Sequence, residues 1–337
     1  MAAMRHLLLP LALAAALAGC AQPVPDAWQA RAAARESSLA VALPMPDAAS
    51  HETRYFSWQD RQRARTVLAK LYLPAHSTGP VPLVVFSHGI GGSREGYTYL
   101  GKYWAANGYA SLHLQHPGSD RNLWVGNPLT LMSRLQDAAQ ESEAKDRALD
   151  LGFALDRLLE SDVAARIDTA RIAAAGHSYG ANTTLLAAGA QLQREGRTVA
   201  FGDPRIRAAV VISAPPFHGE PDAQQILRPV RIPTLHITAA DDDIRIPGYT
   251  SGLKDRVDVY AAVGGTRKSL AVFKGGSHSI FTDRLGTGGA EWNPQVKAAT
   301  RELALDFLRS VFDDAPGAFE TSAARHAALL ERLENRY

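Results

Sequence analysis

The sequence predicts an α/β fold: a mostly parallel sheet of about eight strands with helices on both faces. Short apolar runs alternate along the chain with segments whose apolar residues recur at helical spacing, the pattern of strands joined by crossover helices. Several runs, such as residues 81–86 and 208–212, are almost wholly apolar, as in strands buried on both faces. The chain has 337 residues, 46% of them hydrophobic and 21% charged, which is enough for one large domain.

The expected elements follow in a regular order. Residues 53–74 predict two antiparallel strands joined by a polar turn, and residues 81–92 predict an apolar strand that ends in a glycine-rich loop. The later expected strands lie within residues 109–120, 170–176, 206–216, 232–243 and 269–278, and the expected helices lie near 96–107, 143–160 and 293–312. Residues 117–144 have no clear period, and we expect a loop or a lid there.

The N-terminal residues have the features of an export signal. Residues 1–19 contain a basic start at Arg5 and a short apolar run, typical of a secretory signal peptide and too short to span a membrane. The segment ends in L-A-G-C, which resembles the lipobox of bacterial lipoproteins and implies lipidation of Cys20. Because Cys20 is the only cysteine, no internal disulfide can form. We expect an exported lipoprotein of the bacterial cell envelope, with plain secretion or a periplasmic location as the alternative.

The organisation that follows has four parts. After the signal peptide, residues 20–50 are rich in Ala, Pro and Ser and predict a lipid-anchored linker. Residues 51–312 form the expected α/β domain, and residues 313–337 are expected to form a helical extension. The net charge of +2 comes without a long basic run, so nothing indicates a nucleic-acid partner.

Residues 176–180 read G-H-S-Y-G and lie between an apolar strand and a helix. Glycine and serine are common turn residues, so the pattern alone is weak. In the setting of a strand-to-helix turn, however, it is typical of a nucleophile elbow, where the serine presents its hydroxyl and the glycines remove Cβ atoms that would clash. That interpretation requires an acid and then a histidine later in the chain.

Both partners follow Ser178 in the required order. A serine hydroxyl needs a base, histidine suits neutral pH, and a buried carboxylate must orient that histidine. Three aspartates, Asp241, Asp242 and Asp243, follow one apolar strand, and His278 follows the next in a glycine-rich loop. Such sites form at the carboxyl ends of parallel strands. We therefore expect catalytic residues Ser178, His278 and one of the three aspartates.

An ester's tetrahedral intermediate also needs N–H donors for its negative oxygen. One expected donor is the residue after the nucleophile, Tyr179. The other is expected in the loop at residues 88–92, H-G-I-G-G, where Ile90 lies between glycines that let the backbone turn inward. Ile90 and Tyr179 are thus the predicted oxyanion hole, and His88 is expected to support the loop.

Metal sites are poorly supported by the sequence. His113 and His116 lie three residues apart but lack further ligands, and the three aspartates lack the spacing and glycine of a calcium loop. We therefore expect no metal site. His177 is given no chemical role.

Over residues 53–312 the chain resembles the α/β-hydrolase superfamily. Its segments FSHGIGGSREGY, LHLQHPGSD, GHSYGAN, LHITAADDD and GGSHSIF resemble the dienelactone-hydrolase-like and platelet-activating-factor-acetylhydrolase-like serine esterases. The polyester hydrolases and cutinases are expected to be more distant, because their oxyanion loop lacks H-G-x-G and they usually carry a disulfide. Relatives show Gly-x-x-Asp at the acid, which selects Asp242; because Ala239 replaces that glycine, Asp241 and Asp243 stay candidates.

The resemblance implies a cofactor-free carboxylic ester hydrolase, and we expect it to act on a small-molecule or lipid-like ester. The lipobox at Cys20 implies that a lipid anchor holds it at the membrane. A peptidase or thioesterase with the same triad is the nearest alternative, since the fold does not select the acyl group's partner. A non-catalytic envelope binding protein is a third, although it would not need the complete set of catalytic residues.

The lipobox leads to a prediction for Cys20. The wild-type protein should partition with membranes, and Cys20→Ser should release it or block its processing, because several acyl chains bind a membrane far more firmly than one. Fractionation of expressing cells measures this. A wild-type protein found entirely in the soluble fraction would contradict the lipoprotein hypothesis.

Overall fold

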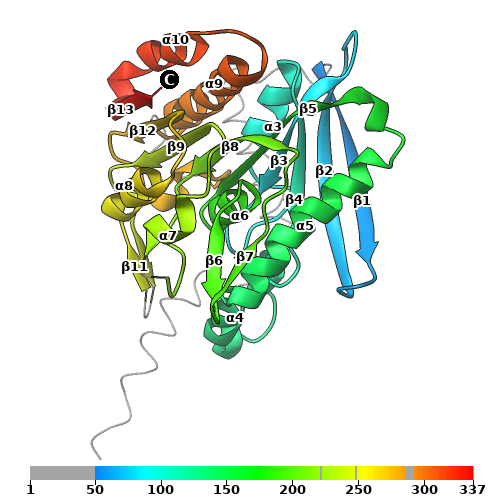
Figure 1. Cartoon of the computed structure of the whole chain (residues 1–337), viewed down its shortest axis with the longest axis vertical. Coiled ribbons are helices and arrows are strands. Elements are labelled where there is room, and N and C mark those ends of the chain that lie inside the picture. Colours follow the sequence, from blue (N-terminus) through cyan, green and yellow to red (C-terminus); the bar gives the residue numbers. More distant parts are fainter. Residues whose placement is uncertain (1–49, 221, 247–248, 285–291, 337) are drawn as a thin grey trace, which may run out of the picture.

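The computed structural model describes residues 50–220, 222–246, 249–284 and 292–336. The expected signal peptide, Cys20 and all but the last residue of the 20–50 linker lie outside them. The described residues form a nine-stranded sheet of order β1-β2-β4-β3-β5-β8-β9-β12-β13 (Figure 1). Its strands are β1 (His51–Asp60), β2 (Arg65–Pro74), β3 (Val81–Ser87), β4 (Ala110–Gln115), β5 (Ile167–His177), β8 (Ile206–Ile212), β9 (Thr234–Ala239), β12 (Lys268–Phe273) and β13 (Leu330–Arg336).

The six inner strands, β4 to β12 in that order, are parallel to one another. The β1–β2 hairpin is antiparallel, as expected, and it joins the sheet through antiparallel pairing of β2 with β4. This confirms the predicted α/β-hydrolase fold. Parallel strands place all their carboxyl ends at one edge, so the loops that follow β3, β5, β9 and β12 are brought together there.

Helices cover both faces of the sheet. The helices are α3 (Thr98–Ala106), α4 (Leu131–Ala138), α5 (Glu141–Leu159), α6 (Tyr179–Ala187), α7 (Ala223–Leu227), α8 (Leu253–Ala262), α9 (Trp292–Phe312) and α10 (Ala318–Arg325). Residues of α3, α9 and α10 share a core with one face of the sheet, whereas α5 to α8 contribute to the cores on the other. In Figure 1, α5 crosses in front of the strands.

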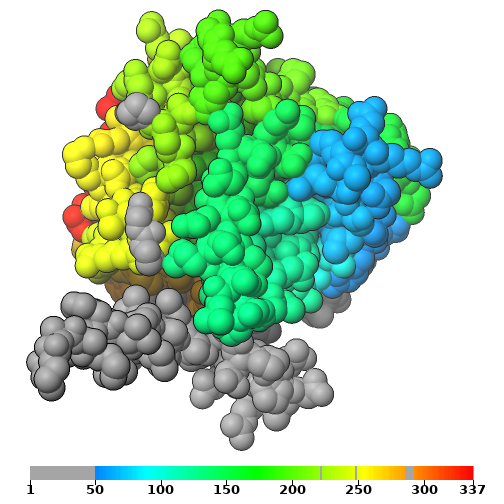
Figure 2. Space-filling model, turned by 90° about the horizontal axis from the view of Figure 1, so that it is seen from below, coloured from blue at the N-terminus to red at the C-terminus, as the bar shows by residue number. Residues whose placement is uncertain are grey.

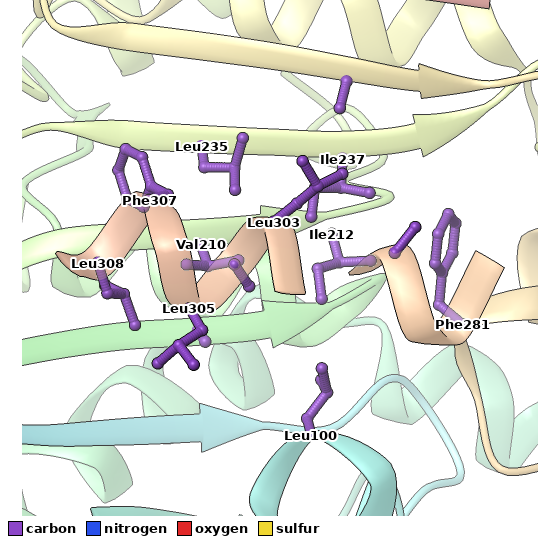
Figure 3. Packing of buried hydrophobic residues seen from close by; sticks show 14 of the residues in the cluster. Leu100, Val210, Ile212, Leu235, Ile237, Phe281, Leu303, Leu305, Phe307 and Leu308 are labelled. Carbon is purple, nitrogen blue, oxygen red and sulfur yellow. The ribbon is translucent and has the colours of Figure 1, made fainter. Parts of the chain in front are cut away.

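Strand alternation divides the core between the two faces. In β3, Val84 and Phe86 point into the core shared with α9, and Leu83 and Val85 point into the core shared with α5. Figure 3 shows the α9 side, where Leu303 and Phe307 lie against strands that carry labelled residues Val210, Ile212, Leu235 and Ile237.

The segment between β4 and α5 contains short helices. Residues 117–144, expected to be a loop or a lid, form the 3₁₀ turns η2 (Arg121–Trp124) and η3 (Pro128–Thr130), then α4 and the start of α5. From below, Figure 2 shows this green region between the blue β1–β2 hairpin and the yellow region that includes α8. Two small hairpins complete the structure, β6 (Gln191–Arg194) with β7 (Arg197–Ala200), and β10 (Ile244–Ile246) with β11 (Tyr249–Ser251).

The C-terminal prediction was wrong in part. A helical extension was expected over residues 313–337, but the helix α10 ends at Arg325, and Leu330–Arg336 form strand β13. This strand pairs antiparallel with β12 and adds the ninth strand to the expected eight. Without it, β12 would present unpaired backbone groups at the sheet edge, and β13 satisfies them. None of the helices in the described ranges is long and apolar enough to span a membrane.

Packing of α9 leads to a stability prediction. Leu303 is fully buried, whereas Leu129 is 84% exposed. Leu303→Ala should reduce the free energy of unfolding by about 2–5 kcal/mol through lost burial and a residual cavity. Leu129→Ala, the matched control, should stay within about 0.5 kcal/mol of wild type. Urea unfolding measures both, and equal losses in the two variants would contradict the packing described here.

Candidate active site

Ser178 occupies a sharp turn between β5 and α6. Its backbone angles are φ 56° and ψ −123°, a conformation that a residue with a side chain rarely adopts. A Cβ on Gly176 would lie 2.2 Å from the carbonyl oxygen of Gly180, and a Cβ on Gly180 would lie 1.9 Å from that of Ser87. Only glycine fits at these two positions. The Ser178 N–H donates to the carbonyl of Ile212 at 2.9 Å, which ties the turn to β8.

The structure brings Ser178, His278 and Asp242 together. His278 begins the 3₁₀ turn η5 (His278–Phe281), and its Nε2 lies 2.7 Å from Ser178 Oγ. Its Nδ1 lies 2.7 Å from Asp242 Oδ1. A carboxylate only accepts hydrogen bonds, so Nδ1 carries the proton and Nε2 is left free to accept one from the serine hydroxyl. This is the arrangement in which histidine acts as a base toward serine.

Asp242 is fully buried but well supplied with donors. Thr238 Oγ1 donates to its Oδ2 at 2.6 Å, and the Ser213 hydroxyl donates to the same oxygen. A buried guanidinium nitrogen of Arg256 lies 3.5 Å from Oδ1. Burial by itself raises the pKa of Asp242, but the hydrogen bond and charge of His278, the charge of Arg256 and the Ser213 bond hold that pKa well below its usual range. The carboxylate therefore stays ionised at neutral pH.

The neighbouring aspartates point elsewhere. Asp241 and Asp243 are exposed on either side of buried Asp242. Asp243 pairs with Arg245 at 2.6 Å, and Asp241 Oδ2 lies near Gly275. The turn that follows β9 places neighbouring side chains on different sides of the backbone, so one carboxylate of the three contacts His278.

Sequence reasoning gave no role to three residues that contact this acid: Thr238, Ser213 and Arg256. Ser213 follows β8 with φ 57°, and its Oγ lies 3.1 Å from His278 Nδ1 as well as against Asp242. Its position directly after an apolar strand, like that of the aspartates, was a usable signal. Arg256 belongs to α8 and donates to Ser251, and nothing in its local sequence indicates that its guanidinium is buried.

His177 links the nucleophile turn to the backbone of His278. Its Nε2 lies 3.0 Å from the carbonyl oxygen of His278, so this nitrogen donates. Its Nδ1 must then accept, and the Tyr97 hydroxyl donates to it at 2.9 Å. Burial and the nearby charge of His278 lower the pKa of His177 to about 3, so it stays neutral. His177 therefore helps to hold the backbone of His278 in position.

The loop at residues 88–92 lies against Ser178. A Cβ on Gly89 would be 3.2 Å from the Ser178 Cβ. The Gly91 N–H donates to the Ser119 carbonyl at 2.8 Å, and the Trp124 indole donates to the Gly91 carbonyl at 2.8 Å. Within the described residues, the N–H of Ile90 donates to no other group.

Tyr179 supplies a second N–H beside the nucleophile. As the first residue of α6, it has no intrahelical acceptor for that group. The predicted donors Ile90 and Tyr179 therefore belong to two backbone segments that each adjoin Ser178.

The two histidines considered as metal ligands make other contacts. His113 Nε2 lies 2.9 Å from the Ser111 hydroxyl, and its Nδ1 lies 3.2 Å from the Gly96 carbonyl. His116 lies between Ser87 and Asp150, at 3.1 Å from each. In the ranges that the structure describes, no group of three His, Cys, Asp or Glu side chains is arranged to hold a metal ion.

Comparison with known proteins gives the family. The family model described as PET hydrolase-like matches residues 67–288, a range that includes Ser178, Asp242 and His278. The chain belongs to this family. It is a carboxylic ester hydrolase, as the sequence predicted. From the sequence, we expected the polyester hydrolases to be more distant, because of their oxyanion loop. That expectation was wrong, since the matching family model is described as PET hydrolase-like.

A solved structure has a fold similar to that of this hydrolase. A ferulic acid esterase from Streptomyces cinnamoneus matches with a TM-score of 0.58 and 23% sequence identity, over 79% of this chain and 91% of that chain. No curated protein matches the chain.

The contacts of the three aspartates lead to a prediction for this hydrolase. Asp242→Asn should lower kcat for p-nitrophenyl acetate by about 10³- to 10⁴-fold, because an amide favours the wrong histidine tautomer. Asp243→Asn and Asp241→Asn, the matched controls, should change kcat by about tenfold or less, as surface substitutions do. Steady-state kinetics of the three variants measures this. An Asp242→Asn enzyme that stays active while one of the others is crippled would exclude Asp242 as the acid.

Proposed function

We propose that this hydrolase cleaves carboxylic esters through an acyl-enzyme intermediate on Ser178, with His278 as the base and Asp242 as the orienting acid. The observation that supports this most directly is the continuous line of hydrogen bonds, each 2.7 Å long, from Ser178 through His278 to Asp242. Acyl transfer needs a nucleophile, a base in contact with it and a carboxylate behind the base.

In the first half of the reaction, Ser178 Oγ attacks the ester carbonyl carbon while His278 Nε2 accepts its proton. Buried, ionised Asp242 stabilises the imidazolium and keeps its Nδ1–H directed toward the carboxylate. The carbonyl oxygen becomes an anion, and the N–H groups of Ile90 and Tyr179 are the donors that stabilise it. Both groups are free of other acceptors within the described residues, so they need not give up a hydrogen bond first.

In the second half, the tetrahedral intermediate collapses. The C–O bond to the alcohol breaks, and His278 Nε2–H protonates the departing oxygen, leaving the acyl group on Ser178. Water then loses a proton to His278 and attacks the acyl carbon. The second tetrahedral intermediate collapses with cleavage of the C–O bond to Ser178, and His278 returns the proton to Ser178 Oγ, which releases the carboxylic acid and free serine. None of these steps draws on a metal or a cofactor.

The substrates proposed are small-molecule or lipid-like esters met at the cell envelope, where the predicted lipid on Cys20 would retain the enzyme. An ester is favoured over a peptide because the family is PET hydrolase-like, and polyester hydrolysis breaks the same type of bond. A thioester or peptide bond remains the alternative substrate class, since the same residues activate serine toward any acyl group.

Ser178→Ala tests the proposed mechanism. It should leave folding intact and lower kcat for p-nitrophenyl acetate by on the order of 10³-fold or more, because the nucleophile is lost. A fluorophosphonate probe should label the wild type and leave Ser178→Ala unlabelled. A panel with an aromatic diester, a thioester and a peptide defines the bond type. Wild-type turnover in Ser178→Ala would exclude the acyl-enzyme mechanism.

A further inference from the structure

Arg147 is a buried cation directly behind the site. It projects from α5, and its side chain is fully buried. Its Nε donates to the Thr183 hydroxyl at 2.9 Å, its Nη1 donates to the Ser119 hydroxyl at 2.8 Å, and its Nη2 donates to the His88 carbonyl. The guanidinium carbon also lies 4.5 Å from the centre of the Tyr179 ring.

Two of these contacts act on the loop that bears Ile90. The His88 carbonyl begins that loop, two residues before Ile90. Ser119 holds its other side, because the Ser119 carbonyl accepts the N–H of Gly91 at 2.8 Å. Arg147 therefore binds a backbone carbonyl two residues before Ile90, and it also binds Ser119, whose carbonyl holds the N–H immediately after Ile90.

The other two contacts act on Tyr179. The guanidinium packs on the Tyr179 ring, and the Thr183 hydroxyl that receives Arg147 Nε–H donates in turn to the Tyr179 carbonyl at 3.1 Å. One planar guanidinium group thus connects the two segments that carry the proposed oxyanion donors. A guanidinium suits this task because its five donors have a fixed geometry.

The Arg147 guanidinium forms no direct ion pair with the residues that the structure describes. Within the described residues, none of its nitrogens lies within 4.0 Å of a carboxylate oxygen, and Glu143 reaches it only through the Ser119 hydroxyl, which donates to Glu143 at 2.6 Å. Burying a charge without a direct partner is costly, and even a whole buried ion pair can often be replaced by apolar residues without loss of stability. Stability alone is therefore a poor reason for an arginine here.

We propose that Arg147 is a positioning residue that sets the relative placement of the Ile90 and Tyr179 N–H groups and so shapes the oxyanion hole. This inference rests on the proposed acyl-enzyme function. It predicts that loss of Arg147 weakens binding of the tetrahedral state and spares binding of the planar ester.

Arg147→Met is the principal test, and Arg301→Met is its matched control. Arg301 is also buried and lies 4.5 Å from an aromatic ring centre, that of Tyr103, but it belongs to α9 on the opposite face of the sheet. With active sites counted by fluorophosphonate titration, Arg147→Met should lower kcat for p-nitrophenyl acetate by on the order of 10²-fold, with KM within about threefold, because a small misplacement of oxyanion donors costs that much. Arg301→Met should keep kcat within about twofold.

Inhibitor binding separates positioning from a structural role. An alkyl trifluoromethyl ketone adds Ser178 Oγ to form a tetrahedral oxyanion, whereas the matching methyl ketone stays planar. The affinity of Arg147→Met for the trifluoromethyl ketone should fall by about the same factor as kcat, and its affinity for the methyl ketone should change by about threefold or less. Equal losses for the two ketones, or a wild-type kcat, would overturn the proposal.

A milder pair of variants applies if Arg147→Met does not fold. Thr183→Val removes the hydrogen-bonded link from Arg147 to Tyr179 and leaves the contact of the guanidinium with the Tyr179 ring. It should lower kcat by about threefold to tenfold with KM unchanged, as loss of one supporting hydrogen bond implies. Its control, Thr184→Val, removes a buried hydroxyl that donates to Gly180 and does not contact Arg147. Equal kcat in these two variants would contradict the proposal.

The two proposals fail in distinguishable ways. If Ser178→Ala retains turnover, the acyl-enzyme mechanism itself is wrong. If Ser178→Ala is inactive and unlabelled while Arg147→Met and Thr183→Val behave as wild type, only the role of Arg147 is wrong.

Discussion

The backbone turn at Ser178 is the constraint on which the rest of the site depends. A residue with a side chain at φ 56° and ψ −123° carries strain on the order of 1–3 kcal/mol, which surrounding structure must offset. Here the Ser178 N–H is bonded to β8, and α6 packs so closely that the Gly180 Cα lies against the Ser87 carbonyl. Because Ser87 leads directly into the loop that bears Ile90, α6 and that loop cannot move independently.

That loop is supported by buried polar groups in place of an apolar core. His88 Nε2 accepts the N–H of His116, whose ring lies 3.1 Å from Asp150. Asp150 is paired with Arg65 at 3.0 Å and with Arg63 at 2.8 Å. Burial by itself raises the pKa of Asp150, but its bonds to His116 and Arg65 hold that pKa well below its usual range. Directional bonds fix positions more narrowly than apolar contacts do, which suits a loop proposed to present the Ile90 N–H to a reacting atom.

The sequence predicted most of the fold and the groups that follow parallel strands. Ser178, the aspartates and His278 could be placed because each ends an apolar run, and parallel strands deliver such residues to one edge. The choice of Asp242 needed a family pattern, since adjacent acidic residues carry no periodicity that separates them. Strand β13 could not be distinguished from a helix, because its stability comes from the free edge of β12, which is distant in the sequence.

Contacts between distant segments also explain why Arg147 was missed. It lies 59 residues from His88, on a segment whose leucines predicted an amphipathic helix. In such a pattern charged residues are assigned to the solvent face, yet Arg147 and Asp150 are both fully buried. Helix periodicity identifies which residues share a face, but it does not reveal that the polar residues of that face pack against polar groups of the loop at residues 88–92.

The contacts of the Ile90 loop also indicate which part of residues 117–144 could move as a lid. Residues 119–124 are bound to the Ile90 loop through the Ser119 carbonyl, the Trp124 indole and a backbone bridge between Gly92 and Asp120. Moving this portion would break the bonds that hold the loop in place, so it belongs to the support of the site. Beyond Trp124 the character changes: Val125 is 69% exposed and Leu129 is 84% exposed. Any opening motion that preserves these contacts of the Ile90 loop must therefore begin after Trp124.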